Sequence, residues 1–76
     1  MPEQAQPVTI LRRRDLEARV RLSRTTIYDR INPHSPRYEP EFPKPIKLGA
    51  GVAVGWLDHE VSAWLQSQID RTRGDV

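Results

Sequence analysis

The chain contains no cysteine, which excludes a disulfide framework and a thiolate metal site as sources of stability. Hydrophobic packing must therefore hold the fold together, although only five of the residues are aromatic. No apolar run approaches the roughly 18 residues that a membrane-spanning helix needs, and residues 1–7 lack the basic and apolar parts of a signal peptide. These absences predict a soluble protein of the cytoplasm, without a membrane partner.

Catalytic and metal-binding groups are also scarce. A chain of 76 residues permits one small domain, which is too small for an enclosed substrate cavity with its own lid. His34 lies in a proline-rich stretch. Asp58, His59 and Glu60 are consecutive, so on a helix they would fan out by roughly 100° per residue and could not meet at one site. We therefore expect no enzyme, no metal site and no cofactor.

Charge is unevenly distributed along the chain, whose net charge is +2 and whose pI is near 9.5. From Arg12 to Arg30 there are seven arginines and three carboxylates. From Leu57 to Asp70 there are three carboxylates and no lysine or arginine. A basic half and an acidic half on one small domain favour a polyanionic partner on one side. A solvated charged surface is the alternative interpretation, because surface arginine is common.

A short helix over residues 23–31 is the best-marked element. Ser23 suits its N-cap, because the hydroxyl can accept a hydrogen bond from a backbone N–H of the first turn. Ile27 and Ile31 are four residues apart and therefore share one buried face. The face that remains for a partner carries Arg24, Thr25, Tyr28 and Asp29.

A second helix is predicted just before this one, over residues 13–20. Leu16 and Val20 fall at helical spacing, and only two residues follow before Ser23. Two short helices with a tight connection form a helix-turn-helix, whose second helix enters the major groove of DNA with its N-terminal residues at the base edges. Those residues would be Arg24, Thr25 and Thr26.

Five residues in or beside the first helix are expected to contact phosphate, to form the turn or to pack the two helices together. Arg12, Arg13 and Arg14 stand at its start, where each charge opposes the helix dipole by some tenths of a kcal/mol. A nearby phosphate would relieve this, so the three are candidate phosphate contacts. In the turn, Arg21 stands where such motifs prefer a glycine that tolerates a left-handed backbone. We expect Ala18 to permit the close approach of the two helices.

A loop and a β-hairpin are predicted next. Three prolines between Asn32 and Phe42 exclude a helix or a central strand, and Tyr38 and Phe42 are the expected core anchors of the loop. Two segments, 44–48 and 52–56, then flank Gly49-Ala50-Gly51, which predicts a hairpin with a three-residue connection. Alternation along these strands predicts one core face with Ile46, Leu48, Val54 and Trp56 and an outer face with Lys47, Ala53 and Gly55.

The last predicted element is a helix over residues 57–72, with Asp58 as its N-cap and Gly74 just beyond its end. Its apolar positions recur at helical spacing and predict one buried face. That face carries Leu57, Val61, Trp64, Leu65 and Ile69.

Four stretches together resemble the AlpA-type phage regulators. They are Leu22-Ser23-Arg24-Thr25-Thr26-Ile27-Tyr28, Phe42-Pro43-Lys44-Pro45-Ile46-Lys47-Leu48-Gly49, Ala53-Val54-Gly55-Trp56, and Glu60-Val61 with Ala63-Trp64-Leu65. The resemblance covers residues 10–70, and the ordered combination is specific in a way that no single piece is. It implies a small winged helix-turn-helix, similar to MerR-type DNA-binding domains and to phage excisionases.

The implied activity is DNA binding, to regulate prophage genes or to direct excision by an integrase. The resemblance transfers DNA contact to Ser23, Arg24, Thr25, Thr26 and Tyr28 in the second helix and to Lys44 and Lys47 around the wing. Two positions depart from the family pattern: Arg21 replaces the usual turn glycine, and Val52 stands where the wing commonly has arginine.

The sequence thus predicts a mainly α fold with a small β-hairpin, arranged as a winged helix-turn-helix over residues 9–73 after a flexible arm over 1–8. The predicted function is sequence-specific binding of double-stranded DNA. One such module buries only about 600–1,000 Å² of protein surface on DNA, which limits its affinity. We therefore expect self-association of several copies on repeated sites, or a phage integrase as a further partner. The alternative is a protein-interaction adaptor that uses Tyr28, Tyr38 and the acidic last helix.

Overall fold

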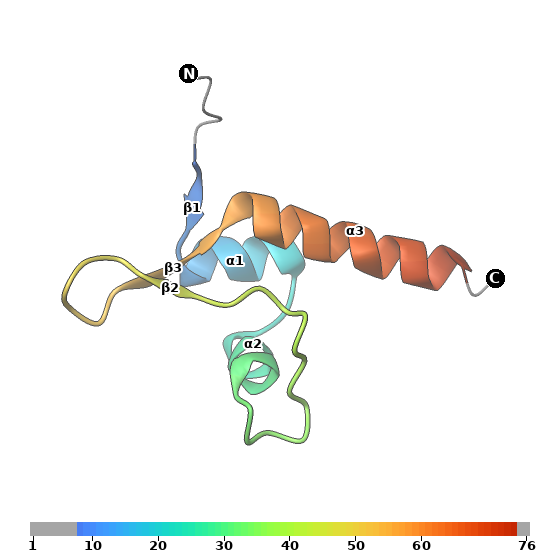
Figure 1. The fold of residues 1–76 in the computed structure, drawn as a ribbon, viewed down its shortest axis with the longest axis horizontal. Helices are drawn as coiled ribbons and strands as arrows, with labels where there is room; N and C mark the ends of the chain where they lie inside the picture. Colours follow the sequence, from blue (N-terminus) through green and yellow to red (C-terminus); the bar gives the residue numbers. More distant parts are fainter. Residues whose placement is uncertain (1–7, 75–76) are drawn as a thin grey trace.

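A computed structural model describes residues 8–74, so the expected N-terminal arm lies outside the described residues except for Val8. The elements follow in the order β1 (Ile10–Leu11), α1 (Arg13–Val20), α2 (Arg24–Ile31), β2 (Ile46–Lys47), β3 (Val54–Leu57) and α3 (Asp58–Gly74). Within this range the chain is a small mixed α/β domain, with three helices and a three-stranded antiparallel sheet. In Figure 1, α1 overlaps α3, to which it is joined by contacts of Arg19 with Ser62 and Asp58, α2 lies below and packs on α1, and the β2–β3 loop projects from the body.

The sheet contains a strand that the sequence did not predict. Ile10 pairs with Leu57 and Leu11 with Trp56, which places β3 between β1 and β2. The Asp58 N–H extends this pairing, since it donates to the Thr9 carbonyl at 3.0 Å. A strand of two residues has too few positions to show the alternation that marks a strand in a sequence.

The register of the hairpin corrects the predicted faces. Lys47 lies opposite Val54, and the Leu48 N–H donates to the Ala53 carbonyl at 2.9 Å, so the connection is residues 49–52 and not 49–51. A change of one residue in register moves a side chain to the other face of the sheet. Lys47 therefore shares a face with Val54 and Trp56. The predicted core residues Ile46 and Leu48 lie on the opposite face, where Ile46 is 37% exposed.

The last helix differs from its prediction at both ends. Leu57 ends β3, and α3 begins at Asp58, which is therefore inside the helix and not its N-cap. Val61 and Trp64 are buried as expected, but Ile69 is 42% exposed. Figure 1 shows the reason, because the C-terminal half of α3 extends past the rest of the molecule.

The helix pair has the predicted turn and cap. Arg21 adopts φ 61° and ψ 33°, the left-handed region that glycine usually fills, and its N–H donates to the Glu17 carbonyl at 2.8 Å. Ser23 caps α2, because its hydroxyl accepts from the Thr26 N–H at 3.2 Å. Ala18 is exposed, so the expectation that it mediates the helix contact is wrong.

One hydrophobic core joins all three helices to β3 and to the loop after α2. Its buried side chains are Leu16, Val20, Ile27, Phe42, Trp56, Val61 and Trp64. The predicted anchor Phe42 is 1% exposed and contacts the Trp64 ring edge to face, with centroids 4.9 Å apart. The Glu39 carboxylate accepts from both the Trp64 indole N–H and an Arg30 Nη, so the loop connects the end of α2 to α3.

None of the helices that the structure describes is both long enough and apolar enough to cross a bilayer.

Candidate nucleic-acid interface

An open groove joins three parts of the chain that are distant in sequence. It lies between the start of α1, one side of α2 and the segment that leads into β3. Its lining residues are Arg12, Arg13, Arg14, Tyr28, Val52, Ala53 and Val54. The predicted phosphate-binding arginines therefore share one concave surface with Tyr28 of the second helix and with the hairpin.

The three arginines of this arginine groove are held differently. Arg12 donates from Nε to the Val54 carbonyl at 3.0 Å, a contact across 42 positions of the sequence. Arg13 forms an ion pair with Glu17, one helical turn away. Arg14 is exposed. Arg12 thus ties the hairpin to α1, while Arg14 presents its guanidinium to solvent, where a phosphate can accept from it in a bidentate manner.

The first turn of α2 contains both engaged and available side chains. The Ser23 hydroxyl accepts from the Thr26 N–H and donates to the Thr26 hydroxyl at 3.0 Å, so these two groups partly satisfy each other. Thr26 is also half-buried, whereas Arg24 and Thr25 are exposed. Of the residues expected at the base edges, Arg24 and Thr25 are therefore the most accessible.

Arg24 is connected to the arginine groove through Tyr28. Its guanidinium carbon lies 5.8 Å from the centroid of the Tyr28 ring, within the range of a cation–π contact. Tyr28 is 40% exposed and lines the groove, one turn after Arg24. Tyr28 consequently connects Arg24, in the exposed first turn of α2, to the arginines of α1.

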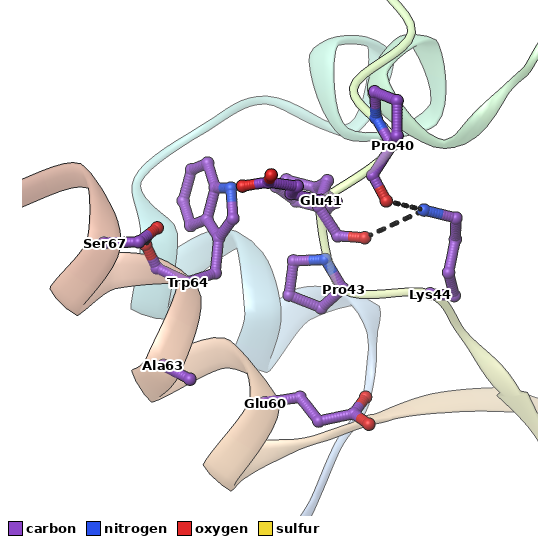
Figure 2. Close-up of a pocket in the computed structure, with 9 residues that line it drawn as sticks. Pro40, Glu41, Pro43, Lys44, Glu60, Ala63, Trp64 and Ser67 are labelled. Atoms are coloured by element: carbon purple, nitrogen blue, oxygen red, sulfur yellow. Dashed lines mark hydrogen bonds between the residues drawn. The ribbon is translucent and has the colours of Figure 1, made fainter. Parts of the chain in front are cut away.

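The two predicted wing lysines lie in different surroundings. Lys47 is exposed and stands opposite Val54, which lines the arginine groove. Lys44 lines a second groove, on the α3 side (Figure 2). Its ammonium donates to the backbone carbonyls of Pro40 and Phe42 at 2.8 and 3.1 Å and lies 5.4 Å from the Tyr38 ring centroid. Lys44 thus stabilises the loop that follows α2, and its position does not support a contact between the wing and DNA.

Sequence reasoning missed the hairpin side of the groove. Val52, Ala53 and Val54 have no charge or hydrogen-bonding side chain, so their residue types carried no signal for a polyanion site. Neither did the sequence indicate that Arg12 bonds to the backbone of Val54. The sequence signal on this side of the groove was that Val52 departs from the arginine typical of the family.

The chain matches the family model described as "Prophage CP4-57 regulatory protein (AlpA)" over residues 9–69. It belongs to the AlpA family. This confirms the resemblance, and the family is one of regulatory proteins, so the chain is not an enzyme.

Two curated relatives support the assignment to the AlpA family. A protein of Escherichia coli (strain K12) named "DNA-binding transcriptional activator AlpA" is 43% identical over 61 residues, which are 80% of this chain and 86% of the relative. "Uncharacterized protein ORF88" of Enterobacteria phage P4 is 44% identical over 54 residues, which are 70% of this chain and 53% of that relative. No solved structure matches the chain.

Proposed function

We propose that residues 9–73 form a winged helix-turn-helix that binds duplex DNA with sequence preference and regulates prophage genes. The observation that carries the proposal is the arginine groove, which brings Arg12, Arg13 and Arg14 together with Tyr28 and the hairpin. The geometry supports α1 and α2 as the helix pair and the projecting β2–β3 hairpin as the wing. The printed name of the Escherichia coli relative points to the same activity.

The residues divide into two roles in this proposal. Arg13, Arg14 and Lys47 hold phosphates, because they are positively charged groups in or beside the groove. Their contacts position the protein on the duplex and do not depend on the base sequence. Arg24 and Thr25 read base edges from the exposed first turn of α2. Ser23 and Thr26 keep that turn in shape through their mutual hydrogen bonds.

Within prophage regulation, we propose activation of transcription in preference to assistance of an integrase in excision. The support is again the name of the relative with the larger coverage. A module of this size buries only about 600–1,000 Å² on DNA, so we expect several copies on repeated sites or a second protein to raise the affinity. The site of action would be the chromosome, in the cytoplasm.

The test is a gel-shift titration against the DNA upstream of the chain's own gene, with a scrambled duplex as control, at several salt concentrations. We expect the affinity for both duplexes to fall by about 0.9 log units per phosphate contact for each log unit of salt, with the upstream duplex bound more tightly. Failure to shift any duplex at low salt would exclude the proposal, and the adaptor interpretation would then take its place.

A further inference from the structure

A second groove lies between α3 and the loop that precedes β2. Its lining residues are Pro40, Glu41, Phe42, Pro43, Lys44, Glu60, Ala63, Trp64 and Ser67 (Figure 2). None of these residues lines the arginine groove, so the two are separate surfaces. We call this one the tryptophan groove.

The inner wall of the tryptophan groove is apolar. Trp64 and Phe42 pack edge to face at its base, where they are 8% and 1% exposed, and the more accessible apolar lining residues are Pro40 and Ala63. The polar atom of the indole is already used, because its N–H donates to Glu39. The Ser67 hydroxyl is likewise occupied, since it donates to the Trp64 carbonyl at 2.7 Å. Between its charged residues, a guest in this groove would therefore meet the hydrocarbon of Pro40 and Ala63 and the edge of the Trp64 ring.

Negative charge borders this apolar wall. Glu60 is exposed and has neither a hydrogen bond nor an ion pair with any residue of the range 8–74. Glu41 lies 3.5 Å from Arg71, but the two side chains are 73% and 59% exposed, and ion pairs in such surroundings contribute little. Lys44 directs its ammonium to the carbonyls of Pro40 and Phe42, as the dashed lines of Figure 2 show.

We propose that the tryptophan groove docks a partner protein through a segment in which a lysine or arginine adjoins a leucine-like side chain. The apolar side chain would pack on Pro40, Ala63 and the exposed edge of Trp64, and cations of the segment would pair with Glu41 and Glu60, which lie on opposite sides of Pro43 in Figure 2. A partner fits better than a second copy, because three clustered arginines of this chain line the arginine groove, while Arg71, at the exposed end of α3, already pairs with Glu41. The choice of a partner over a second copy rests on the proposed function, in which DNA occupies the arginine groove. The lining and the charge of the tryptophan groove do not depend on the proposed function.

The first experiment is a two-dimensional amide NMR titration of the full chain without DNA. The probe is the synthetic peptide acetyl-Lys-Leu-Ala-Lys-Leu-Ala-amide, and the controls carry Glu in place of Lys or Ser in place of Leu. We expect the Lys-Leu peptide to shift the indole N–H of Trp64 and the amides of Ala63 and Ser67 in a saturable manner. Equal shifts with either control peptide, or shifts centred on Arg12 to Arg14, would overturn the proposal.

The second experiment removes the carboxylates. The double variant E41Q/E60Q should bind the Lys-Leu peptide about fivefold more weakly, since two exposed charge pairs are lost. Asp70→Asn is the matched control, because Asp70 is exposed on the same helix outside the groove and, within residues 8–74, accepts only from Gln66. A loss in D70N equal to that in E41Q/E60Q would contradict a specific site.

Two further readouts separate this proposal from others. Gel shifts with E41Q/E60Q should match those of the parent, so a failure of DNA binding in both proteins would concern the proposed function and leave the peptide result standing. Concentration-dependent broadening of the Trp64 indole signal in the free protein, abolished in E41Q/E60Q, would show that a second copy covers the groove, and the partner proposal would be wrong.

Discussion

Arg24 and Lys47 both present a positive charge to solvent, yet their geometry supports different contributions to DNA binding. The planar guanidinium of Arg24 can donate to guanine O6 and N7 together, a contact worth about 1–3 kcal/mol of discrimination between bases. Lys47 can offer only a compact charge. We therefore predict that Arg24→Ala reduces the preference for the specific duplex, whereas Lys47→Ala weakens all duplexes alike and lowers the salt slope by about one.

The measurement is a titration of both alanine variants with specific and scrambled duplexes at several salt concentrations. Arg73→Ala is the matched control for the loss of one positive charge, because Arg73 is exposed on α3 and lines neither groove. If Lys47→Ala changed the specificity ratio while Arg24→Ala did not, the assignment of α2 as the reading helix would be wrong.

Arg21 lowers the stability of the protein through its backbone conformation. Its φ of 61° is unfavourable for a side chain with a Cβ and easy for glycine. Arg21→Gly should therefore stabilise the protein by about 0.5–1 kcal/mol, a gain limited by the extra freedom of glycine in the unfolded chain. Thermal unfolding of Arg21→Gly and Arg21→Ala separates backbone from charge, because the alanine variant removes the charge and keeps the Cβ. An equal gain of stability in both variants would mean that the loss of the positive charge, and not the relief of the backbone, stabilises the protein.

At the scale of elements, the attachment of β1 to β3 depends on the absence of a side chain at Gly55. A Cβ there would lie 2.5 Å from Ile10 Cγ2 and 3.3 Å from the Leu11 carbonyl oxygen. We predict that Gly55→Ala destabilises the protein by about 1–3 kcal/mol, since β1 must shift to relieve the contact. Gly51→Ala is the matched control in the hairpin connection, because a Cβ there meets no atom within 4 Å and should leave the melting temperature nearly unchanged.

A second prediction for the elements concerns Glu39, which connects the end of α2 to α3. Its carboxylate accepts from Arg30 Nη1 at 2.6 Å and from the Trp64 indole, and its side chain is 22% exposed. Glu39→Ala leaves both donors without this acceptor and should cost about 2–3 kcal/mol of unfolding free energy. Chemical denaturation measures the loss. Glu41→Ala is the control, and with its exposed pair to Arg71 it should lose less than about 0.5 kcal/mol.

At the scale of the whole molecule, stability depends on a core of few residues, and Trp64 links its parts. The ring is 8% exposed and contacts Phe42, while its N–H bonds to Glu39. Truncation of a buried indole costs roughly 3–5 kcal/mol, which is comparable with the entire stability of a small domain. We predict that Trp64→Ala abolishes cooperative unfolding, as followed by circular dichroism on heating. A cooperative transition within a few degrees of the parent would contradict this account of the core.

The sequence by itself determined the features that depend on neighbouring residues. The cap at Ser23, the spacing of Leu16 and Val20 and the prolines after Asn32 act within one or two helical turns, and they placed both short helices and the loop correctly. The ordered motifs also sufficed to recognise the AlpA family, because they need only their order along the chain.

Only the tertiary structure decided which of these parts meet. The two-residue strand β1 forms because it pairs with β3. The backbone hydrogen bond between Leu48 and Ala53 sets the register of the hairpin and therefore which side chains share a face. The arginine groove likewise requires Arg12 to reach the carbonyl of Val54, 42 positions later. Such contacts arise when the core closes and distant segments come within hydrogen-bonding reach, so no local pattern of residues encodes them.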